Sequence, residues 1–530
     1  MRICPSPGPV TVGAVVLGVL AAGLCLHRLP DEPDPPPACG KHLVLHGDDC
    51  LGVSDGTDVF ASGVPGMRQV FARIAEQNKA VAGEKHATVA LLIPLESDSP
   101  AVRRQILSEV QGACLAQARA NGEDAAKPPI RLVLANPGRE YRHWRYTVGE
   151  LRRREPHLRI VAGFNLSLED TREAMEYVTN TLRVPAVASL VTASDFANPE
   201  GRDEVPFPGL ARAIPTSEKQ AAALLRFDPG LVGAETALVA DHRPEDSYNR
   251  ALREAFTEAR EENGRSAGIQ DMRFVSPGME KPGVTANEFQ DFAANICRSN
   301  ARVVYFAGRA FHLELFIKKL AGAYCREKRS YTVITGSSAT TLDERLDARD
   351  RALLSGDPGA GKPSVSVLYP APAHPDAWST AIAEWKAAKD GRRTPPGYLT
   401  EPQDALETLR RDIAREAGGI GPVSLDDGRT IMTHDVVLLA SEELARAAHT
   451  SGTELPSADR VRKDLGKLNA ELRVVGAGGW TCLTNAGNPY DKAVPLVRLV
   501  PASRRLTLEG VAWPEGQPPQ EDCVVPANPQ

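Results

Sequence analysis

From residue 87 onward, short apolar runs alternate with amphipathic stretches along the chain. The segment 87–95 is a continuous apolar run, which is typical of a strand buried on both faces. Val102, Ile106 and Val110 then recur at four-residue spacing and form one apolar face of a predicted helix. Further strands are predicted at 130–135, 159–163 and 184–191. This alternation predicts βα units around a mainly parallel sheet.

The same alternation appears again in the second half of the chain, with strands predicted at 236–240, 302–307, 331–334 and 364–369. The helix after the first of these has an apolar stripe that starts at Tyr248. Helices at 405–414 and 435–449 follow, and 465–493 is Gly-rich and strand-like. Because one hydrophobic core stops growing at about 250 to 300 residues, a chain of 530 residues should form more than one core. We therefore expect an α/β protein of two lobes.

The N-terminus differs from the rest of the chain. Residues 10–26 are an unbroken run of apolar, Gly and Thr residues, which just reaches the length of about 17 residues that a transmembrane helix needs. The run is either an uncleaved membrane anchor, which we favour, or a signal peptide cleaved near residues 21–23. Acidic residues follow it, so the body is expected outside the cytoplasm, anchored to the cell membrane or secreted if the segment is cleaved. Prolines at 33–37 predict a stiff spacer.

Composition and motifs exclude several functional classes. The chain has 62 Lys and Arg against 68 Asp and Glu, and its formal net charge is −6. A nucleic-acid partner would need clustered basic side chains that this balance does not supply. The segment 356–362 has the spacing of a phosphate-binding loop, but Pro363 stands where a Ser or Thr must bind magnesium. We therefore expect a protein that is not an enzyme, without catalytic residues, a cofactor or a metal.

The nine cysteines indicate an oxidising compartment, where disulfides persist. Cys4 and Cys25 belong to the N-terminal segment, and Cys114 is expected to stay unpaired. The helix that enters the strand at 302–307 ends near Cys297, and the helix that leaves this strand ends near Cys325, so both lie at one edge of the sheet. The predicted disulfide pairs are Cys39 with Cys50, Cys297 with Cys325, and Cys482 with Cys523.

The order of these motifs resembles the type I periplasmic-binding-protein family, specifically the branched-chain amino-acid-binding receptors of ABC transporters. Segment 207–223 (FPGLARAIPTSEKQAAA) looks like the family's lobe-crossing segment, with an Arg, then Pro-Thr and a Gln-containing helix. Segment 238–264 is similar to the family's strand, acidic loop and tyrosine-led helix. Segment 303–320 matches the next strand, glycine and helix, and 434–448 looks like the helix that carries the Tyr/His-Asp-Ala signature, with Val436 in place of alanine. The resemblance covers about residues 87–512.

This resemblance implies two lobes, each a mainly parallel sheet flanked by helices, that are joined by multiple chain crossings. The segments expected along the chain are a signal or anchor segment 1–28, a Pro-rich linker 29–38, an N-terminal extension 39–85, lobe 1 at 86–214, lobe 2 at 215–368, a return to lobe 1 at 369–452, a return to lobe 2 at 453–513 and a tail 514–530.

Candidate ligand-binding residues follow the predicted strands, because ligands bind beyond the carboxyl ends of the strands in open parallel sheets. Ser167 begins a capping-box-like sequence, where its hydroxyl caps a helix or, with neighbouring N–H groups, holds a ligand carboxylate. Thr192 and Ser194 follow the fourth strand, where the resemblance implies polar contacts with an amino-acid group; ordinary turn residues would look the same.

The second lobe contributes further candidates. Tyr248 opens a helix after an acidic loop, and in the family this tyrosine packs on the ligand; alternatively it is a core residue. Arg309 follows Gly308, where the family has an aromatic contact, and either pairs with an acidic ligand group or is exposed. Ser338 lies after Gly336, where the family often has an acidic residue for the ligand's ammonium group. These departures leave the ligand's identity open.

The resemblance implies an extracytoplasmic solute-binding protein that closes its two lobes on a small polar ligand, amino-acid-like, for uptake by an ABC permease. The alternative is a membrane-anchored sensor ectodomain whose closure signals through a partner protein. A third possibility is a binding scaffold whose site has decayed.

Overall fold

The computed structural model describes residues 39–123, 127–201, 205–231, 233–263, 265–266, 270–325, 330–357, 361–389, 393–500, 506–519 and 523–526. The expected anchor and linker, residues 1–38, lie outside the described residues. Among the helices that the structure describes, none has the length and apolar character needed to cross a membrane.

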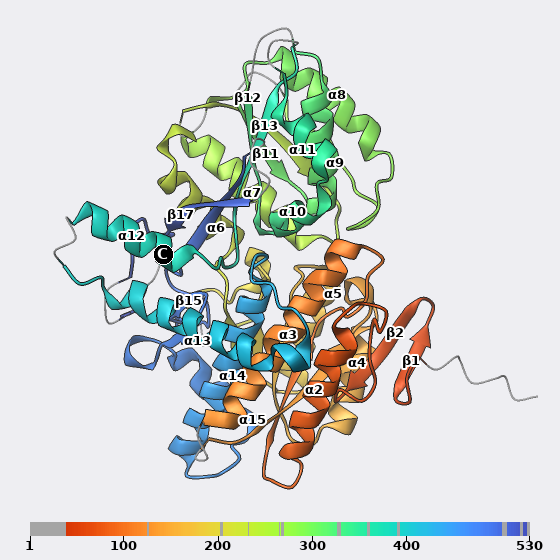
Figure 1. Cartoon of the computed structure of the whole chain (residues 1–530), viewed down its shortest axis with the longest axis vertical. Helices are drawn as coiled ribbons and strands as arrows, with labels where there is room; N and C mark the ends of the chain where they lie inside the picture. The colour runs from red at the N-terminus through yellow and green to blue at the C-terminus, as the bar shows by residue number, and fades with distance from the viewer. Residues whose placement is uncertain are drawn as a thin grey trace, which may run out of the picture.

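Two sheets build two lobes, which lie one above the other in Figure 1. The sheet of lobe 1 has the order β1-β2-β4-β3-β5-β6-β7. Its strands from β3 to β7 run parallel, whereas the hairpin β1–β2 joins β4 in antiparallel orientation. The strands are β1 (Leu43–His46), β2 (Asp49–Ser54), β3 (Ala87–Leu92), β4 (Ile130–Asn136), β5 (Leu158–Gly163), β6 (Ala186–Ala188) and β7 (Leu210–Arg212).

The extension 39–85 is part of lobe 1 and not a separate unit in front of it. Its hairpin forms one edge of the sheet, as Figure 1 shows. Its helix, α2 (Met67–Ala80), buries Met67, Phe71 and Ile74 in the same core as β3. The other helices of this part of lobe 1 are α3 (Pro100–Glu123), α4 (Trp144–Arg154) and α5 (Glu169–Glu176).

Lobe 2 is built around a sheet of order β10-β8-β11-β12-β13-β16-β17, with the short strand β9 paired to β8. Strands β8 to β13 are parallel to their neighbours, and β16 and β17 add in antiparallel orientation. The strands are β8 (Glu235–Asp241), β9 (Arg265–Ser266), β10 (Met272–Phe274), β11 (Val303–Ala307), β12 (Ser330–Ile334), β13 (Ser364–Pro370), β16 (Val494–Leu499) and β17 (Leu506–Ala512). The helices are α6 (Ser217–Phe227), α7 (Ser247–Asn263), α8 (Thr285–Arg298), α9 (Ala310–Gly322), α10 (Leu342–Arg345) and α11 (Ala348–Ser355).

The chain then returns to lobe 1 through α12 (Ala377–Ala388), α13 (Gly397–Ile420) and α14 (Arg429–Ser451). Helix α12 was not predicted; with α13 it forms the arm at the left of Figure 1. Helix α14 crosses α3 so closely that a side chain at Gly112 would meet the Thr430 carbonyl. A glycine in the middle of a helix is therefore required by this contact.

The expected boundary at residue 453 is wrong. Helix α15 (Ala458–Asp464) and the hairpin β14 (Val474–Gly476) with β15 (Gly479–Thr481) follow α14, and the rest of 465–493 is mainly loop and not strand. Val461, Leu465 and Val474 are buried in the core of lobe 1. The apolar side chains of 453–483 pack against the core of lobe 1. The chain therefore rejoins lobe 2 only with β16.

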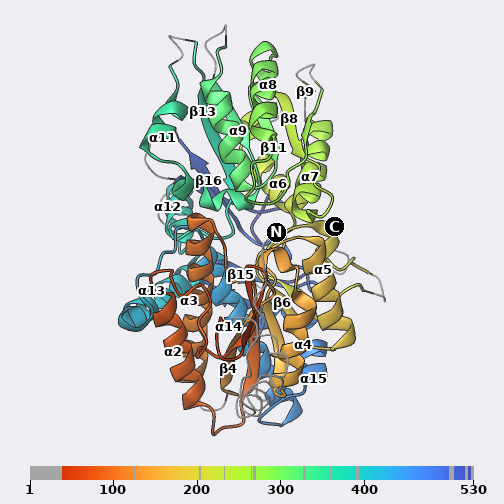
Figure 2. The ribbon, with the colours of Figure 1, turned by 90° about the vertical axis from the view of Figure 1, so that its right-hand side faces the viewer.

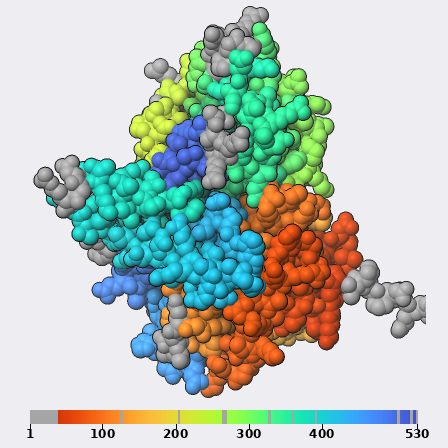
Figure 3. Space-filling model, viewed as in Figure 1, coloured from red at the N-terminus to blue at the C-terminus, as the bar shows by residue number. Residues whose placement is uncertain are grey.

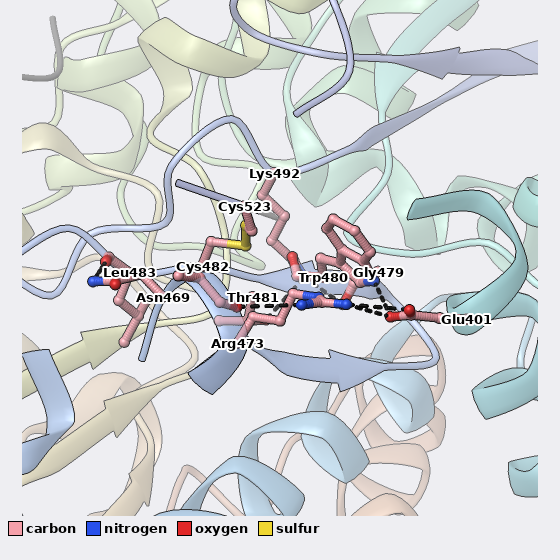
Figure 4. Close-up of a disulfide and its surroundings, with 11 residues drawn as sticks. Glu401, Asn469, Arg473, Gly479, Trp480, Thr481, Cys482, Leu483, Lys492 and Cys523 are labelled. Atoms are coloured by element: carbon pink, nitrogen blue, oxygen red, sulfur yellow. Dashed lines mark hydrogen bonds and ion pairs between the residues drawn. A yellow bond between two sulfur atoms is a disulfide. The ribbon is translucent and has the colours of Figure 1, made fainter. Parts of the chain in front are cut away.

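Three disulfides join Cys39 to Cys50, Cys297 to Cys325, and Cys482 to Cys523. Cys114 is a buried free thiol, and burial raises its pKa to about 12. Figure 4 shows the Cys482–Cys523 bond, which attaches the C-terminal tail next to Trp480 at the end of β15.

Candidate ligand-binding site between the lobes

The carboxyl ends of the parallel strands of both lobes meet at the lobe interface (Figure 2). The loop after β5 carries Ser167, and the start of α7, after β8, carries Tyr248. The backbone N–H of Tyr248 donates to the Ser167 carbonyl at 3.1 Å. Two predicted residues from different lobes are therefore in direct contact.

Ser167 does not cap the helix that follows it, which corrects the capping-box prediction. Helix α5 has Leu168 at its N-cap and no side-chain cap. The Ser167 hydroxyl oxygen instead accepts hydrogen bonds from the backbone N–H groups of Thr192 (3.1 Å) and Ala193 (3.3 Å). The reason is tertiary: the loop after β6 brings two buried N–H groups to this hydroxyl, and a buried donor without an acceptor is costly.

Arg309 is buried and paired, not exposed. It donates to Asp246 through Nε at 2.8 Å and Nη2 at 2.7 Å, and both residues are buried. Its guanidinium lies over the Tyr248 ring, 4.5 Å from the centroid. Burial acts to lower the pKa of Arg309, but Asp246 raises it on balance. Arg309 Nη2 also donates to the Ser167 carbonyl at 3.3 Å, so the ion pair of lobe 2 is joined to lobe 1.

Ser338 completes this network from the loop after β12. Its backbone N–H donates to the Tyr248 hydroxyl at 3.1 Å, and the two side-chain oxygens are also 3.1 Å apart. Burial raises the pKa of Tyr248, which therefore stays a neutral phenol at physiological pH.

Thr192 and Ser194 occupy different places. Thr192 takes part in the network through its backbone, while its buried hydroxyl accepts from Ser217 Oγ at 3.1 Å. Ser194 is exposed at the start of a short 3-10 helix and lines a different pocket, described below. Four of the six candidates, Ser167, Tyr248, Arg309 and Ser338, are linked to one another by direct contacts. Ser167 takes part through its carbonyl, and Tyr248 and Arg309 through their side chains.

A cavity of about 80 Å³ lies beside this network. Its charged lining residues are Glu109, Glu280, Arg309, Arg345 and Arg429. Pockets for drug-sized ligands typically measure about 300–1,000 Å³, so this cavity has room for only a very small molecule. Among the described residues, no cluster of three or more His, Cys, Asp or Glu side chains could hold a metal ion.

Sequence reasoning missed the acidic members of the site. Asp246 is one, although it lies in the acidic loop just before Tyr248. Glu109 is another; it lies on α3, forms an ion pair with Arg429 of α14, and accepts from Asn165 Nδ2 at 2.8 Å. Burial raises the pKa of Glu109. Its partners are far away in the sequence, so no local signal marks it.

Further contacts join the lobes around the site. The ion pairs are Arg243–Glu140 at 2.7 Å and Arg104–Glu344 at 2.7 Å. Gln105 Nε2 also donates to Thr340 Oγ1 at 3.3 Å. Figure 3 shows the lobes packed against each other on this face of the molecule. These polar contacts connect the two lobes, and the ion pairs are only partly buried.

No sequence-family model and no curated protein sequence matches the chain. Solved structures do match. The leucine binding protein LivK of Thermotoga maritima is 14% identical, with a TM-score of 0.57, over 81% of this chain and 99% of that one. An ABC transporter substrate binding protein of Aeropyrum pernix is 15% identical, with a TM-score of 0.56, over 83% and 98%.

Two further structures contain ligands. LivJ of Streptococcus pneumoniae, in complex with isoleucine, is 13% identical with a TM-score of 0.55, over 81% of this chain and 99% of that one. A Rhodopseudomonas palustris solute binding protein in complex with 4-hydroxybenzoate is 12% identical with a TM-score of 0.55, over 81% and 96%. At these identities the likeness shows the fold, and the chain has the type I periplasmic-binding-protein-like fold of two α/β lobes.

Proposed function

We propose that the chain is an extracytoplasmic solute-binding protein, not an enzyme, that closes its lobes on a small polar ligand for uptake by an ABC permease. The observation that carries the proposal is the contact between Ser167 of lobe 1 and the Tyr248–Arg309 pair of lobe 2. Polar groups from both lobes converge at one point there. A ligand at this point would couple binding to lobe closure.

The chemistry of the site favours a ligand with a carboxylate, amino-acid-like. Three arginines and two glutamates line the cavity. Each arginine is paired with an acidic side chain, so a ligand carboxylate would replace one of these partners. The ligands named for two solved neighbours, isoleucine and 4-hydroxybenzoate, share a carboxylate. Because the cavity measures about 80 Å³, the ligand enters a more open form and displaces part of the Arg309 network, or it is very small.

The N-terminal apolar run would tether this body to the outer face of the cell membrane, and a permease would receive the ligand there. Solved neighbours described as ABC-transporter binding proteins support the transport partner. The three disulfides suit an oxidising compartment.

The experiment is a ligand screen by thermal unfolding of the full-length chain, followed by tryptophan fluorescence from its five tryptophans. The compounds are amino acids, aromatic carboxylates, short peptides and purines. A ligand at one hundred times its Kd should stabilise the protein by about 2.7 kcal/mol. Tyr248→Ala should abolish this shift. Tyr324→Ala is the matched control, because Tyr324 is 78% exposed.

A hit that Tyr248→Ala leaves unchanged would place the binding site elsewhere. A folded protein that no compound stabilises would contradict the proposal and favour a scaffold whose site has decayed.

A further inference from the structure

A second pocket, of about 240 Å³, lies at the hinge between the lobes. Its walls come from the end of β7, the start of α6, the segment 484–491 before β16, and residues 514–515 after β17. These are segments where the chain passes from one lobe to the other. The pocket shares no lining residue with the cavity in the cleft, so it is a separate site.

The wall of this pocket contains a buried arginine with unsatisfied donors. Arg212, at the end of β7, has 0% of its surface exposed. Its Nη2 donates to the Val191 carbonyl at 2.8 Å, whereas Nε and Nη1 have no hydrogen-bond partner in the part of the chain that the structure describes. A guanidinium carries five N–H donors and keeps its charge. A buried cation of this kind normally has an anion against it.

Among the described residues, no carboxylate forms an ion pair or a hydrogen bond with Arg212. Asp195 is the acidic residue whose charge acts on Arg212. Its carboxylate Oδ2, however, accepts from Arg250 Nη2 at 2.5 Å and from Ser247 Oγ at 2.9 Å. The Asp195 carboxylate thus binds side chains at the start of α7. Nε and Nη1 of Arg212 can still donate to a ligand.

We propose that the hinge pocket binds a small carboxylate, which Arg212 holds through Nε and Nη1. The ligand replaces the missing counter-ion, and the pocket that Arg212 lines has space for a molecule of a few heavy atoms. Since the walls belong to both lobes, occupancy also changes the relative stability of open and closed forms.

The acidic residues of the pocket restrict the ligand to one negative charge. Glu200 accepts from Thr484 Oγ1 at 2.6 Å and from Asn488 Nδ2 at 2.8 Å. Glu515 forms an ion pair with Lys219 at 3.0 Å. Glu218 and Asp491 also line the pocket. These carboxylates would repel phosphate or a dicarboxylate more strongly than a monocarboxylate, and they would favour an amino acid whose ammonium group faces them.

The test is titration of the full-length chain with acetate, propionate and glycine at constant ionic strength, with chloride and phosphate as comparison anions. Binding is followed by calorimetry and thermal unfolding. We expect saturable stabilisation by the monocarboxylates and a weaker effect of phosphate. Arg212→Gln should weaken carboxylate binding at least tenfold. The control is Arg153→Gln, because Arg153 is an exposed arginine of α4 with a side chain that is 68% exposed.

Arg212 is buried, so its variant can fail to fold. A second variant, Glu218→Gln, changes an exposed residue at the pocket and should tighten acetate binding several-fold, because it removes a repelling charge. A crystal structure with acetate should show the carboxylate against Nε and Nη1 of Arg212. Stabilisation by glycine above acetate would identify the ligand as a zwitterion. The proposal is overturned if chloride acts as strongly as acetate, if Glu218→Gln has no effect, or if the crystal shows only water at Arg212.

Discussion

Glu140 of lobe 1 and Arg243 of lobe 2 form an ion pair across the lobe interface, with Arg243 Nη2 2.7 Å from Glu140 Oε2. The side chains are only 18% and 11% exposed. Glu140 and Tyr141 both have left-handed backbones, with φ of 57° and 63°. Two such residues in succession cost conformational energy, and here that conformation directs Glu140 toward the opposite lobe.

Removing this pair should open the molecule. In Arg243→Gln, Glu140 loses its ion-pair partner in lobe 2, so the closed form becomes less stable relative to the open one. We expect a larger radius of gyration in small-angle X-ray scattering and weaker binding of any cleft ligand, since a smaller fraction of the protein is in the competent form. Arg153→Gln, within one lobe, should change neither. An unchanged radius in Arg243→Gln would show that other contacts hold the lobes.

The same pair predicts a pH dependence. Burial acts to raise the pKa of Glu140, but Arg243 lowers it on balance. A carboxyl with a pKa below its unfolded value stabilises the native state above that value, and this contribution disappears as pH falls through the native pKa. As the pH decreases below about 4.5, the free energy of unfolding should therefore decrease less steeply in Arg243→Gln than in the wild type. Urea unfolding between pH 3 and 7 measures this difference, and parallel curves would contradict it.

Ser167→Ala should destabilise the protein as well as alter the cleft. The substitution leaves the N–H groups of Thr192 and Ala193 without their acceptor in a buried place. The expected loss is about 1–3 kcal/mol, measured by urea unfolding without ligand. Ser379→Ala, on the exposed side of α12, is the control and should change stability by less than about 0.5 kcal/mol. A Ser167→Ala protein as stable as this control would mean that water replaces the hydroxyl.

The buried pair Arg309–Asp246 should behave as a unit. Replacing Asp246 alone with Asn leaves a buried guanidinium without its counter-ion, and such losses cost about 3–5 kcal/mol. The double variant Asp246→Leu with Arg309→Met should lose less free energy of unfolding than Asp246→Leu and Arg309→Met lose in total as single variants. A double-mutant cycle by chemical unfolding measures the coupling. Additive effects would indicate that the two side chains act independently.

Lys492 should make stability rise at alkaline pH. It is 3% exposed, and its Nζ donates to the Gly479 and Trp480 carbonyls at 3.4 and 3.3 Å and to Thr481 Oγ1 at 3.2 Å (Figure 4). Burial lowers its pKa to about 8. Between pH 8 and about 10.4 the unfolded chain binds a proton that the native state has lost, so stability increases with pH.

The variant Lys492→Met should remove this increase and be more stable than the wild type at pH 7, since no charge has to be buried. Urea midpoints at pH 7 and pH 9.5 measure both effects. Lys85→Met, with a side chain that is 73% exposed, should keep the wild-type pH profile. An identical pH slope in Lys492→Met would show that another group titrates.

The architecture of the two lobes could be predicted from the sequence, because a strand buried on both faces must be a contiguous apolar run. The predicted strands 130–135 and 302–307 correspond to β4 and β11. The positions of Ser167, Tyr248 and Ser338 after strands or at helix starts followed from the same local pattern. Short-range periodicity contains this information since it reflects which face of each element is buried.

Other features depended on the tertiary structure alone. The hairpin β1–β2 joins lobe 1 because β4 offers a free sheet edge there. Segment 453–483 packs on lobe 1 because the core of that lobe offers an apolar surface. Asp246 and Arg309 are 63 residues apart, and Ser167 and Arg309 are 142 apart. The first pair forms only when lobe 2 folds, and the second only when the two lobes pack together. No repeat of apolar residues along the chain encodes the distance between two polar groups. The sequence thus determined the elements and their order, whereas the packing of the two lobes decided which polar groups meet in the cleft.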